Sequence, residues 1–433
     1  MTPGKTTRDN QTQDNQAHDH QVQDKQPPLM GLATLMSMAY AGVDLRPLGI
    51  QLAERAGNNP EDANALMDLS TVMQLTFSPD VALDLQAQAL AISRHYKLPA
   101  ANKEAVRLLA LMAPGELMAN APLEFLVQDS DIALEMLYVS PDLPLPSSLP
   151  AHDVLFVAVN ESDANRPVLE RIEELIKASV RPVLNVPARI ALLSRDGSCA
   201  LLKSAPGIVM PAAVRMDRQG LEEIGRERKV IGDILGEGEF PIIVRPVDSH
   251  AGRGLSRLDD PSAIADYLNG NTDSEFFISP FIDYRGTDGL FRKYRIVLID
   301  GRPYACHMAV STQWMVHYLN AGMADSADKR AEEARWMEGF DQGFAQRHHQ
   351  ALHHIAVRMG LDYLVIDCAE TAAGDLLVFE VDSGAVVHAM DPVDVFPYKP
   401  PQMRKIFAAF RALLLRAKRG NPSRDEGPDD DGV

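Results

Sequence analysis

The sequence predicts a multidomain protein, with an α-helical, repeat-like module at the N-terminus, an α/β domain after it and an α+β domain at the end. Three observations support this prediction. Apolar residues recur every three to four positions over 29–101, strands alternate with helices over 105–211, and paired strands follow one another over 212–418. A chain of 433 residues is also too long for one ordinary core, so two or three domains are expected.

Two polar tails flank a composition that is typical of soluble globular proteins. Apolar residues make up 46% of the chain and charged residues 24%. Residues 1–28 are rich in Gln, Asp and Asn, and residues 419–433 are similar. Both tails are expected to be disordered, because they cannot bury enough apolar surface to offset the entropy of ordering them.

Charge and cysteine content exclude several classes of function. A net charge of −18 argues against a nucleic-acid partner, which needs a basic face. There is no apolar run of about eighteen residues and no signal-peptide pattern, so no membrane partner is expected. Cys199, Cys306 and Cys368 are scattered without CxxC spacing, which predicts a cytoplasmic protein with no disulfide framework and no zinc site.

The helical module over 29–101 divides into two helix–turn–helix units of about thirty-five residues each. With Ala89 and Leu90 in the last helix and Tyr96 near its end, the units resemble tetratricopeptide repeats. Two units fall short of the three or so that usually form a stable array, so the module is expected to dock on the next domain. It is then either a helical brace or a groove that presents a peptide or protein substrate.

The next two domains differ in how their strands connect. Over 105–211, three apolar strands and an amphipathic helix at 166–179 alternate, which predicts a parallel α/β layer. Over 212–418, hairpins dominate, which predicts an antiparallel α+β unit. Its strands are expected within 241–258, 275–284, 292–310, 362–370 and 375–383.

The first candidate site is the stretch "IIVRPVDSHAGRGLSRL", residues 242–258. Arg245 ends an apolar strand, and Gly252 and Gly254 follow where glycine permits a positive φ and close approach of a ligand. Their N–H groups, with the Ser249 hydroxyl, are expected to surround a phosphate as a backbone nest. The alternative is a plain hairpin, because the stretch is neither a Walker A loop nor a dinucleotide fingerprint.

Three carboxylates at strand ends form the second candidate site. Asp367 closes the run "YLVID", and Glu380 and Asp382 close "LLVFEVD" on one face of their strand. A hairpin between the runs would bring Asp367 opposite the other two. Because three buried like charges repel one another, Mg²⁺ shared with substrate phosphates is the expected partner. The alternative is that each acid is merely solvated.

The third candidate site combines the stretch "SPFIDY", which leads into Asp283, with a basic strand after it. Lys293 and Arg295 are two residues apart, so they share one strand face and are expected to meet a nucleotide phosphate or an acyl-phosphate oxygen. The alternative is surface charge on an edge strand. His349 and His353 have helical spacing but no HExxH glutamate and no third ligand, which favours a solvated helix face over a zinc site.

Taken in order, these motifs resemble the ATP-grasp fold, and most closely its glutathione-synthetase and ribosomal-protein glutamate ligase branch. The resemblance covers about residues 105–415, with 105–211 as the preceding α/β (pre-ATP-grasp) domain and 212–418 as the ATP-grasp domain. The stretch "RPVLNVPARIALLSRD" resembles the end of that preceding domain, where a strand leads into Asn-x-Pro. The order of the motifs is specific, whereas no single motif is.

The resemblance implies a role for each candidate residue. It assigns ATP phosphates to Arg245 and a flexible phosphate loop to Ser249, Gly252 and Gly254. It assigns adenine to the hinge residues Ser279, Phe281, Ile282 and Asp283, and Mg²⁺ (or Mn²⁺) to Asp367, Glu380 and Asp382. Arg295 and His307 fall where family members handle the acceptor carboxylate or the acyl phosphate.

Four positions depart from the family pattern. Arg245 stands where lysine is usual, which replaces a point charge with a planar fork. Asp382 stands where asparagine is commoner, and His307 stands where arginine is usual. The first phosphate lysine is absent, and Arg195 is a substitute for it. These departures do not remove the expected ATP site, but they argue against the acceptor substrate that is usual in the family.

The resemblance implies an ATP-dependent ligase that joins a carboxylate to an amine or thiol through an acyl phosphate. Its expected partners are ATP, Mg²⁺ and the two co-substrates, one of which is a peptide or protein if the helical module presents it. Two alternatives remain: a kinase of the same fold, and a catalytically inactive ATP-binding protein that acts through its helical repeats.

Overall fold

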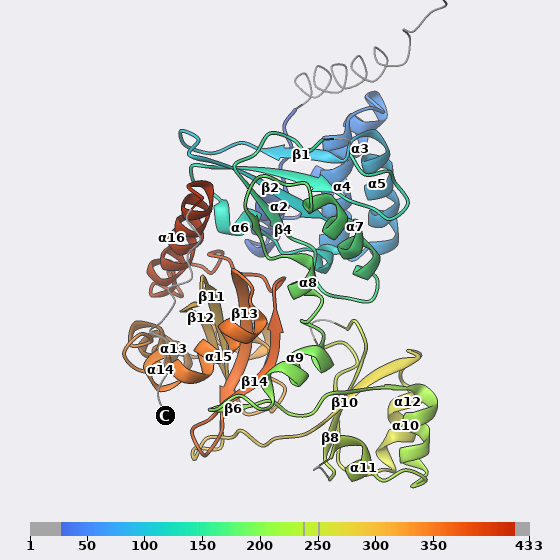
Figure 1. Ribbon diagram of the computed structural model, residues 1–433, viewed down its shortest axis with the longest axis vertical. Coiled ribbons are helices and arrows are strands. Elements are labelled where there is room, and N and C mark those ends of the chain that lie inside the picture. The colour runs from blue at the N-terminus through green and yellow to red at the C-terminus, as the bar shows by residue number, and fades with distance from the viewer. Residues whose placement is uncertain (1–26, 147, 237–238, 250–251, 421–433) are drawn as a thin grey trace, which may run out of the picture.

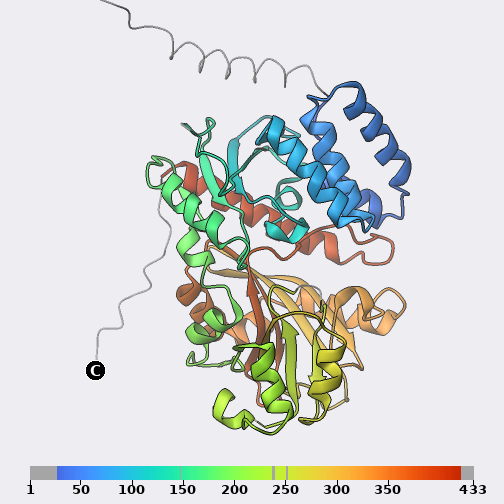
Figure 2. The same ribbon diagram turned by 90° about the vertical axis from the view of Figure 1, so that its right-hand side faces the viewer.

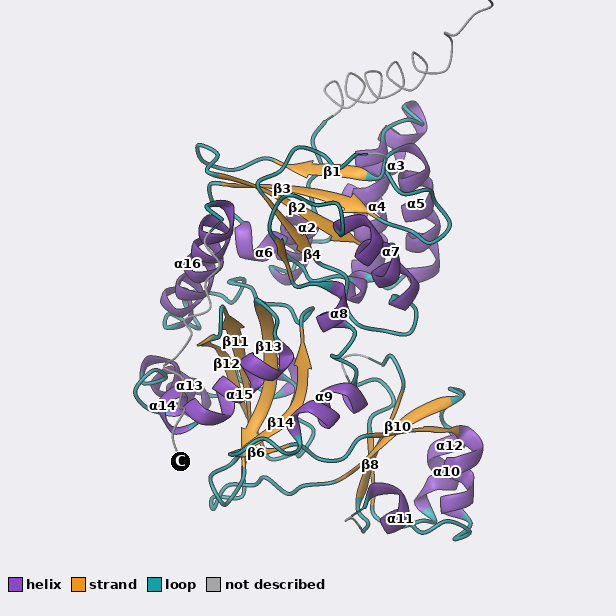
Figure 3. Ribbon diagram, viewed as in Figure 1, coloured by secondary structure: helices purple, strands orange, loops and turns teal. Residues whose placement is uncertain are grey.

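The computed structural model describes residues 27–146, 148–236, 239–249 and 252–420. Within them the strands form three sheets, with helices packed on their faces and a helical region at the N-terminal end (Figures 1 and 3). The disorder predicted for the tails lies almost wholly outside these residues. No helix in the described part of the chain has both the length and the apolar character needed to cross a membrane.

The N-terminal helical region contains α2 (Leu32–Tyr40), α3 (Arg46–Asn58), α4 (Ala63–Leu75) and α5 (Pro79–Ile92), as its apolar periodicity predicts. The Asp62 carboxylate caps α4 by accepting a hydrogen bond from Ala65 N at 2.9 Å. Prolines lie in the first turns of α3 and α5, where the missing N–H costs no helical hydrogen bond. The helices are confirmed, whereas the tetratricopeptide resemblance stays a prediction.

The prediction that Tyr96 lies near the end of the last helix is wrong. Helix α5 ends at Ile92, and Tyr96 lies in strand β1 (His95–Leu98), which pairs with β3 (Ile132–Tyr138). The cause is tertiary packing, because the Tyr96 side chain is 1% exposed and its ring meets the Tyr138 ring edge-on at 5.9 Å. Main-chain pairing therefore joins the helical region to the domain that follows.

The first sheet, called the parallel sheet here, has the strand order β1-β3-β2-β4-β5. Strands β2 (Val106–Met112), β3, β4 (Val154–Val157) and β5 (Val183–Leu184) run parallel, which confirms the predicted α/β layer. Helices α6 (Glu124–Val127) and α7 (Arg166–Ile176) follow β2 and β4 in the chain. Almost every residue of β2 and β4 is buried, as expected for parallel strands covered on both faces.

The second sheet, called the outer sheet, is small and antiparallel, with the order β7-β10-β8-β9. Its strands are β7 (Val214–Asp217), β8 (Ile242–Pro246), β9 (Ser256–Leu258) and β10 (Glu275–Pro280), and its helices are α10 (Arg218–Gly225), α11 (Ile231–Leu235) and α12 (Ala263–Asn269). It lies to one side of the other sheets in Figure 1 and has a hydrophobic core of its own. Domains with separate cores can move relative to one another.

The third sheet, called the central sheet, has the order β12-β11-β13-β14-β6. Strands β11 (Phe291–Ile299), β12 (Arg302–Ser311), β13 (Tyr363–Glu370) and β14 (Leu376–Asp382) are antiparallel, as predicted, whereas β6 (Ile208–Val209) is parallel to β14. Helices α13 (Ala327–Glu338), α14 (Phe344–Arg347) and α15 (His349–Met359) lie between β12 and β13 in the chain. His349 and His353 of α15 are exposed, as predicted.

Helix α16 (Lys399–Lys418) lies between the parallel and the central sheets and joins them into one core. Its Phe410 ring packs on Phe156 of β4 at 6.0 Å and on Tyr363 of β13 at 5.7 Å. Figure 2 shows the chain between β14 and α16 passing beneath the N-terminal helices. These two sheets therefore form a fixed body, and the outer sheet approaches it from one side.

Candidate functional site

A cavity of about 720 Å³ opens between the outer sheet, the central sheet and helix α2. This volume lies within the range of about 300–1,000 Å³ that is usual for ligand pockets. Most of the residues that the sequence predicts for the site line it: Arg245, Gly252, Ser279, Phe281, Ile282, Arg295, His307, Asp367, Glu380 and Asp382. The structure thus brings together residues that are up to 137 positions apart in the chain, from 245 to 382.

Three predicted residues do not line the cavity. Ser249 lies behind Arg245, since its hydroxyl accepts a hydrogen bond from Arg245 Nε at 3.1 Å and donates one to Pro246 O at 2.7 Å. Gly254 packs beneath Pro246. Asp283 forms an exposed ion pair with Arg285 at 2.5 Å. Ser249 and Gly254 therefore shape the loop, and the exposed Asp283 side chain lies outside the cavity lining.

Two arginines lie side by side at one end of the cavity. Arg245 projects from β8, and Arg195 begins helix α9 (Arg195–Leu202) after the Ser194 N-cap. Burial, and then the charge of Arg195, lower the pKa of Arg245 to about 10. Two neighbouring, partly buried cations that repel each other form a favourable site for a polyanion. Arg195, a substitute for a missing lysine in the sequence, is therefore well placed to bind phosphate.

The glycine loop requires its glycines. Gly252 and Gly254 have φ of +77° and +64°, as the sequence predicts. A Cβ on Gly252 would lie 2.6 Å from His317 Nε2, and one on Gly254 would lie 2.7 Å from Pro246 Cδ. The position of Gly254 is also fixed by its carbonyl oxygen, which accepts a hydrogen bond from Tyr267 OH at 2.8 Å.

The hinge after β10 forms an apolar wall of the cavity. Phe281 lies between the Arg257 guanidinium, 4.3 Å from the ring centroid, and Trp314, whose ring is 5.7 Å away. The Phe281 amide donates to Pro241 O at 3.0 Å, so it is already paired within the protein. The wall suits a flat, apolar ring such as adenine, although the backbone contact expected at Phe281 is taken.

The hairpin of β13 and β14 brings Asp367 directly opposite Glu380, as the sequence predicts. The Asp367 carboxylate is buried and already paired, however. It accepts from Arg295 Nε at 2.8 Å and Nη2 at 3.0 Å, and from Lys293 Nζ at 2.7 Å. Although burial opposes ionisation, these two cations hold the pKa of Asp367 well below its usual range. The predicted face shared by Lys293 and Arg295 is confirmed, and it meets Asp367.

Glu380 and Asp382 form a partly buried acidic pair beside the two arginines. Glu380 Oε1 accepts a hydrogen bond from Arg195 Nη2 at 2.6 Å, and Asp382 Oδ1 accepts one from Gly384 N at 2.8 Å. Burial, and then the charge of Glu380, raise the pKa of Asp382 to about 6. Hard oxygen ligands whose charges repel one another fit a divalent cation such as Mg²⁺.

Asp367 does not fit that metal set in the geometry described, because cations engage both of its carboxylate oxygens, whereas Arg195 engages Oε1 of Glu380. Among the residues that the structure describes, no three His, Cys, Asp or Glu side chains form a group that could hold a metal ion. The sequence expected three equivalent carboxylates, and the structure shows an acidic pair with a third acid in an ion-pair network. Sequence spacing indicates which residues share a strand face, but it does not indicate whether a carboxylate there pairs with a basic side chain or is left for a metal ion.

His307 lies opposite Arg295 on the neighbouring strand β12. The centre of its ring lies 4.5 Å from that of the Tyr318 ring, with the two planes tilted by 35°. Burial, followed by the charge of Arg295, lowers the pKa of His307 well below its usual value. The side chain is therefore a neutral imidazole at neutral pH. It can share hydrogen bonds with a substrate, but it does not supply the charge of the arginine that is usual at this position in the family that the sequence resembles.

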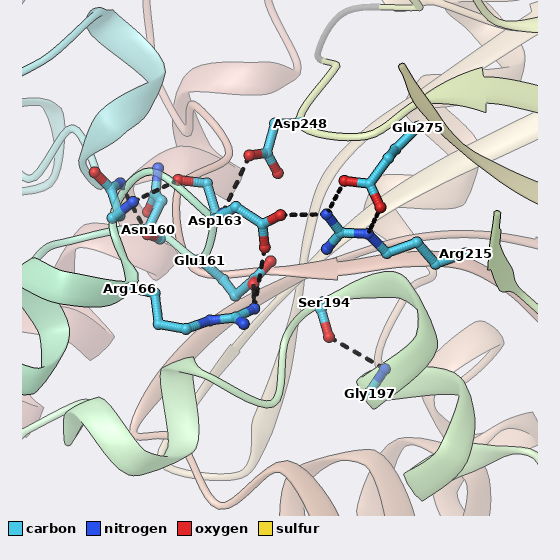
Figure 4. Close-up of polar contacts among 11 residues, drawn as sticks. Asn160, Glu161, Asp163, Arg166, Ser194, Gly197, Arg215, Asp248 and Glu275 are labelled. Atoms are coloured by element: carbon cyan, nitrogen blue, oxygen red, sulfur yellow. Dashed lines mark hydrogen bonds and ion pairs between the residues drawn. The ribbon is translucent and has the colours of Figure 1, made fainter. Parts of the chain in front are cut away.

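Polar contacts hold the glycine loop and the outer sheet against the parallel sheet (Figure 4). Arg215 of β7 pairs with Glu275 of β10 at 2.5 Å and also with Asp163, which lies in the loop before α7. Asp163 N donates to Asp248 Oδ2 at 3.1 Å, just before the glycine loop. These contacts span three segments far apart in sequence, and no sequence pattern indicated them.

Other lining residues were also missed. They include Met36, Tyr40, Met118, Trp314, His317, Tyr318, His388, Met390 and Asp391. Met36 and Tyr40 belong to α2, which the sequence assigned to a separate module, and their helical spacing gave no sign of a ligand. The sequence held one signal of these lining residues: the segment after Asp382 lacks helical or strand periodicity, and loops on a rigid scaffold often carry binding residues.

Comparisons with known proteins give a distant structural likeness only. No protein-family model matches the sequence, and no curated protein matches it. A solved structure of D-alanine–D-alanine ligase from Bacillus anthracis complexed with ATP is 12% identical, with a TM-score of 0.44 over 74% of this chain and 100% of that one. The VanG D-Ala:D-Ser ligase from Enterococcus faecalis is 15% identical, with a TM-score of 0.42 over 73% and 99%. A RimK domain protein ATP-grasp from Sphaerobacter thermophilus is 17% identical, with a TM-score of 0.38 over 72% and 100%. At these values the likeness carries no conclusion about activity or substrate.

Proposed function

We propose that the protein is an ATP-dependent ligase of the ATP-grasp type, which joins a carboxylate to an amine or thiol through an acyl phosphate. One observation carries the proposal. The arginine pair Arg195 and Arg245 lies beside the partly buried acidic pair Glu380 and Asp382, within one cavity. Cations for phosphate and acids for a metal are the two features that phosphoryl transfer needs from a protein.

The nucleotide is assigned to the end of the cavity nearest the outer sheet. Arg195 and Arg245 bind its phosphates, and the wall around Phe281 takes the base. Glu380 and Asp382 hold Mg²⁺ (or Mn²⁺), which when bound neutralises phosphate charge. Asp367 fixes Arg295 and Lys293 in place rather than serving as a third ligand.

The proposed reaction has two steps. An oxygen of the substrate carboxylate attacks the γ-phosphorus of ATP, and the bond to ADP breaks. The amine or thiol then attacks the acyl carbon, phosphate leaves, and the nucleophile loses a proton. Arg295 and Lys293 stabilise the negative charge on the carboxylate and on the acyl phosphate. His307, as a neutral imidazole, hydrogen-bonds the same group. Contacts such as those of Asp163 with Asp248 and Arg215 keep the outer sheet closed, so water is excluded from the acyl phosphate.

The first test is a thermal-shift titration with ATP, with and without Mg²⁺. Binding at a hundred times Kd stabilises the folded protein by roughly 2.7 kcal/mol, so a Mg²⁺-dependent rise in Tm is expected. Folded protein that shows no rise would contradict the proposal. A ligase also releases ADP and phosphate only when both co-substrates are present, whereas a kinase transfers the phosphate to one acceptor.

A second candidate function is nucleotide binding without turnover. The observation that favours it is the engagement of Asp367 by Arg295 and Lys293, together with a neutral histidine at position 307. In that case ATP raises Tm, but no pair of co-substrates yields ADP. A peptide or protein as the amine or carboxylate partner remains part of the ligase proposal, because the helical region borders the same cavity.

A further inference from the structure

The cavity has a second end, which is built by helix α2 and the segment after β14. Tyr40 of α2 donates a hydrogen bond to Asp391 Oδ1 at 3.0 Å, and its ring lies 5.6 Å from the His388 ring. Met36, Met118 and Met390 also line the cavity, with Met36 one helical turn before Tyr40 in α2 and Met390 next to Asp391 in the chain. Methionine side chains adapt to varied apolar shapes. Here the helical region supplies part of a binding wall.

The charges near this end are satisfied within the protein. Asp391 is the charged residue among the described side chains that line it, and its Oδ2 is paired with Lys399 Nζ at 2.9 Å. Lys399 Nζ also donates to Tyr318 OH at 2.5 Å and lies 3.7 Å from Glu333 Oε1. Glu333 accepts further hydrogen bonds from Tyr318, Tyr398 and the Met308 amide, all at 3.0 Å or less. A charged ligand group that entered this end would therefore find no unpaired opposite charge there, and its desolvation would cost binding free energy.

His388 offers one unused hydrogen-bond donor. Its Nδ1 accepts a hydrogen bond from Met390 N at 3.1 Å, so the neutral ring carries its proton on Nε2. Burial lowers the pKa of His388 to about 4, which keeps the ring neutral. Nε2 has no hydrogen-bond partner among the described residues, although the side chain lines the cavity. The ring is half-buried and faces the cavity, so a ligand that displaces water from Nε2 must supply an acceptor of its own or leave this donor unpaired.

We propose that this end, the α2 subsite (Met36, Tyr40, Met118, His388, Met390 and Asp391), binds an uncharged, apolar part of the co-substrate whose one hydrogen-bond acceptor meets His388 Nε2. The inference rests on the proposed ligase function, since it places the co-substrate in the same cavity as ATP. It also gives the helical region a role: α2 selects the substrate from inside the catalytic cavity rather than from a separate groove.

Cysteine chemistry tests the character of the α2 subsite without knowledge of the substrate. Cys199, Cys306 and Cys368 are buried, so a single added thiol reacts selectively. Met36→Cys places a thiol in the subsite, and Thr34→Cys places a matched thiol on the exposed face of the same helix. The probes are methyl methanethiosulfonate and its negatively charged sulfonatoethyl and positively charged trimethylammonioethyl analogues.

Each rate at position 36 is divided by the rate of the same reagent at position 34. The neutral reagent is expected to react at least about tenfold faster than both charged reagents, which corresponds to a cost of about 1.4 kcal/mol for the charge. Equal ratios for all three reagents would overturn the inference. So would a thiol at position 36 that fails to react while the thiol at position 34 does.

The donor is tested with N-acetyl-methionine amide, which is neutral and carries amide acceptors, by saturation-transfer NMR. We expect binding to the wild type and to His388→Gln, which keeps an N–H, and a loss of at least about fivefold in His388→Phe. N-acetyl-glutamate amide is the charged control. Undiminished binding to His388→Phe, or no binding to the wild type, would overturn the assignment of the acceptor.

The same samples separate this inference from the proposed function. ATP with Mg²⁺ is added to wild type, to Met36→Cys labelled with the neutral reagent, and to His388→Phe. If ATP raises Tm in all three while the subsite tests fail, the ligase proposal stands and the subsite is wrong. If ATP raises Tm in none of them, including the wild type, the ligase proposal is wrong whatever the reagents show.

Discussion

Gly384 lies so close to Asn160 that a Cβ on Gly384 would be 1.8 Å from Asn160 Nδ2. Asn160 follows β4 of the parallel sheet, and its amide also donates to Met118 O at 2.8 Å. Gly384 N in turn donates to Asp382 Oδ1. The parallel sheet thus fixes the position of an acid in the proposed metal pair through contacts that only glycine permits at residue 384.

We therefore expect Gly384→Ala to destabilise the fold by about 1–3 kcal/mol, as is usual for overpacking, and to weaken the Mg²⁺-dependent part of the ATP thermal shift. Gly57→Ala is the matched control, because a Cβ at Gly57 in α3 meets nothing within 4 Å. The double variant Asn160→Ala with Gly384→Ala is expected to recover part of the stability, since the clash partner is gone. A Gly384→Ala protein that unfolds at the wild-type urea midpoint would contradict this account.

Asp367 and Glu380 are expected to respond differently to removal of their charge. Asp367→Asn leaves the partly buried Arg295 and Lys293 without their partner; breaking a fully buried pair costs about 3–5 kcal/mol, so a loss toward the lower end of that range is expected. Glu380→Gln mainly removes a metal ligand, so it is expected to abolish the Mg²⁺ dependence of ATP binding at a smaller cost in stability. Urea denaturation and thermal shift with ATP separate the two effects. Equal losses of stability in both variants would show that the ion pairs of Asp367 with Arg295 and Lys293 do not contribute more to stability than the contacts of Glu380.

The strands of the central sheet could be predicted from the sequence because their apolar runs are long and their ends carry acids. The register of Asp367 against Glu380 followed from the hairpin alone. What the sequence did not indicate is which groups share a side-chain network. Asp367 meets Lys293 and Arg295 of a strand that precedes it by about seventy positions, and no spacing rule reports such a contact.

The boundary of the helical region was mispredicted for a related reason. The stretch that ends α5 keeps a helical apolar pattern up to Tyr96, but the ring of Tyr96 packs better against Tyr138 in a strand. Tertiary packing overrides local preference at such ends. The contribution of α2 to the cavity was missed for the same cause, since it depends on a hydrogen bond between Tyr40 and Asp391, 351 positions apart.

The start of helix α2 predicts a dependence of stability on pH. Glu124 Oε2 accepts a hydrogen bond from Ala33 N at 2.9 Å, and Asp68 accepts from the amides of Met30 and Gly31. Burial raises the pKa of Glu124 to about 7 and that of Asp68 to about 6. The folded state therefore binds more protons than the unfolded state between about pH 4 and 7, so these two groups make the free energy of unfolding fall as pH rises through that window.

Urea midpoints measured from pH 4.5 to 7.5 check this prediction. Glu124→Gln keeps an acceptor for the Ala33 amide but cannot titrate, so its midpoint is expected to change less with pH than that of the wild type. Glu104→Gln, which alters an exposed ion pair with Arg107, is the control and should follow the wild type. A Glu124→Gln curve parallel to the wild-type curve would exclude Glu124 as a source of the dependence.

The ion pairs of Arg215 are expected to stabilise the closed position of the outer sheet over the nucleotide. It holds Asp163 of the parallel-sheet side and Glu275 of its own sheet at once (Figure 4). We expect Arg215→Met to change Tm little, because partly exposed ion pairs contribute about 0–1 kcal/mol. Loss of this ion-pair free energy destabilises the closed form of the cavity, so Kd for ATP is expected to rise roughly threefold to fivefold. Release of ADP without product is also expected to increase, because water reaches the acyl phosphate. Arg226→Met is the matched control, because its exposed pair with Glu222 stays at the C-terminal end of α10 and connects no sheets. If both variants bind ATP as tightly as the wild type, Arg215 contributes to folding of the outer sheet and not to its closure.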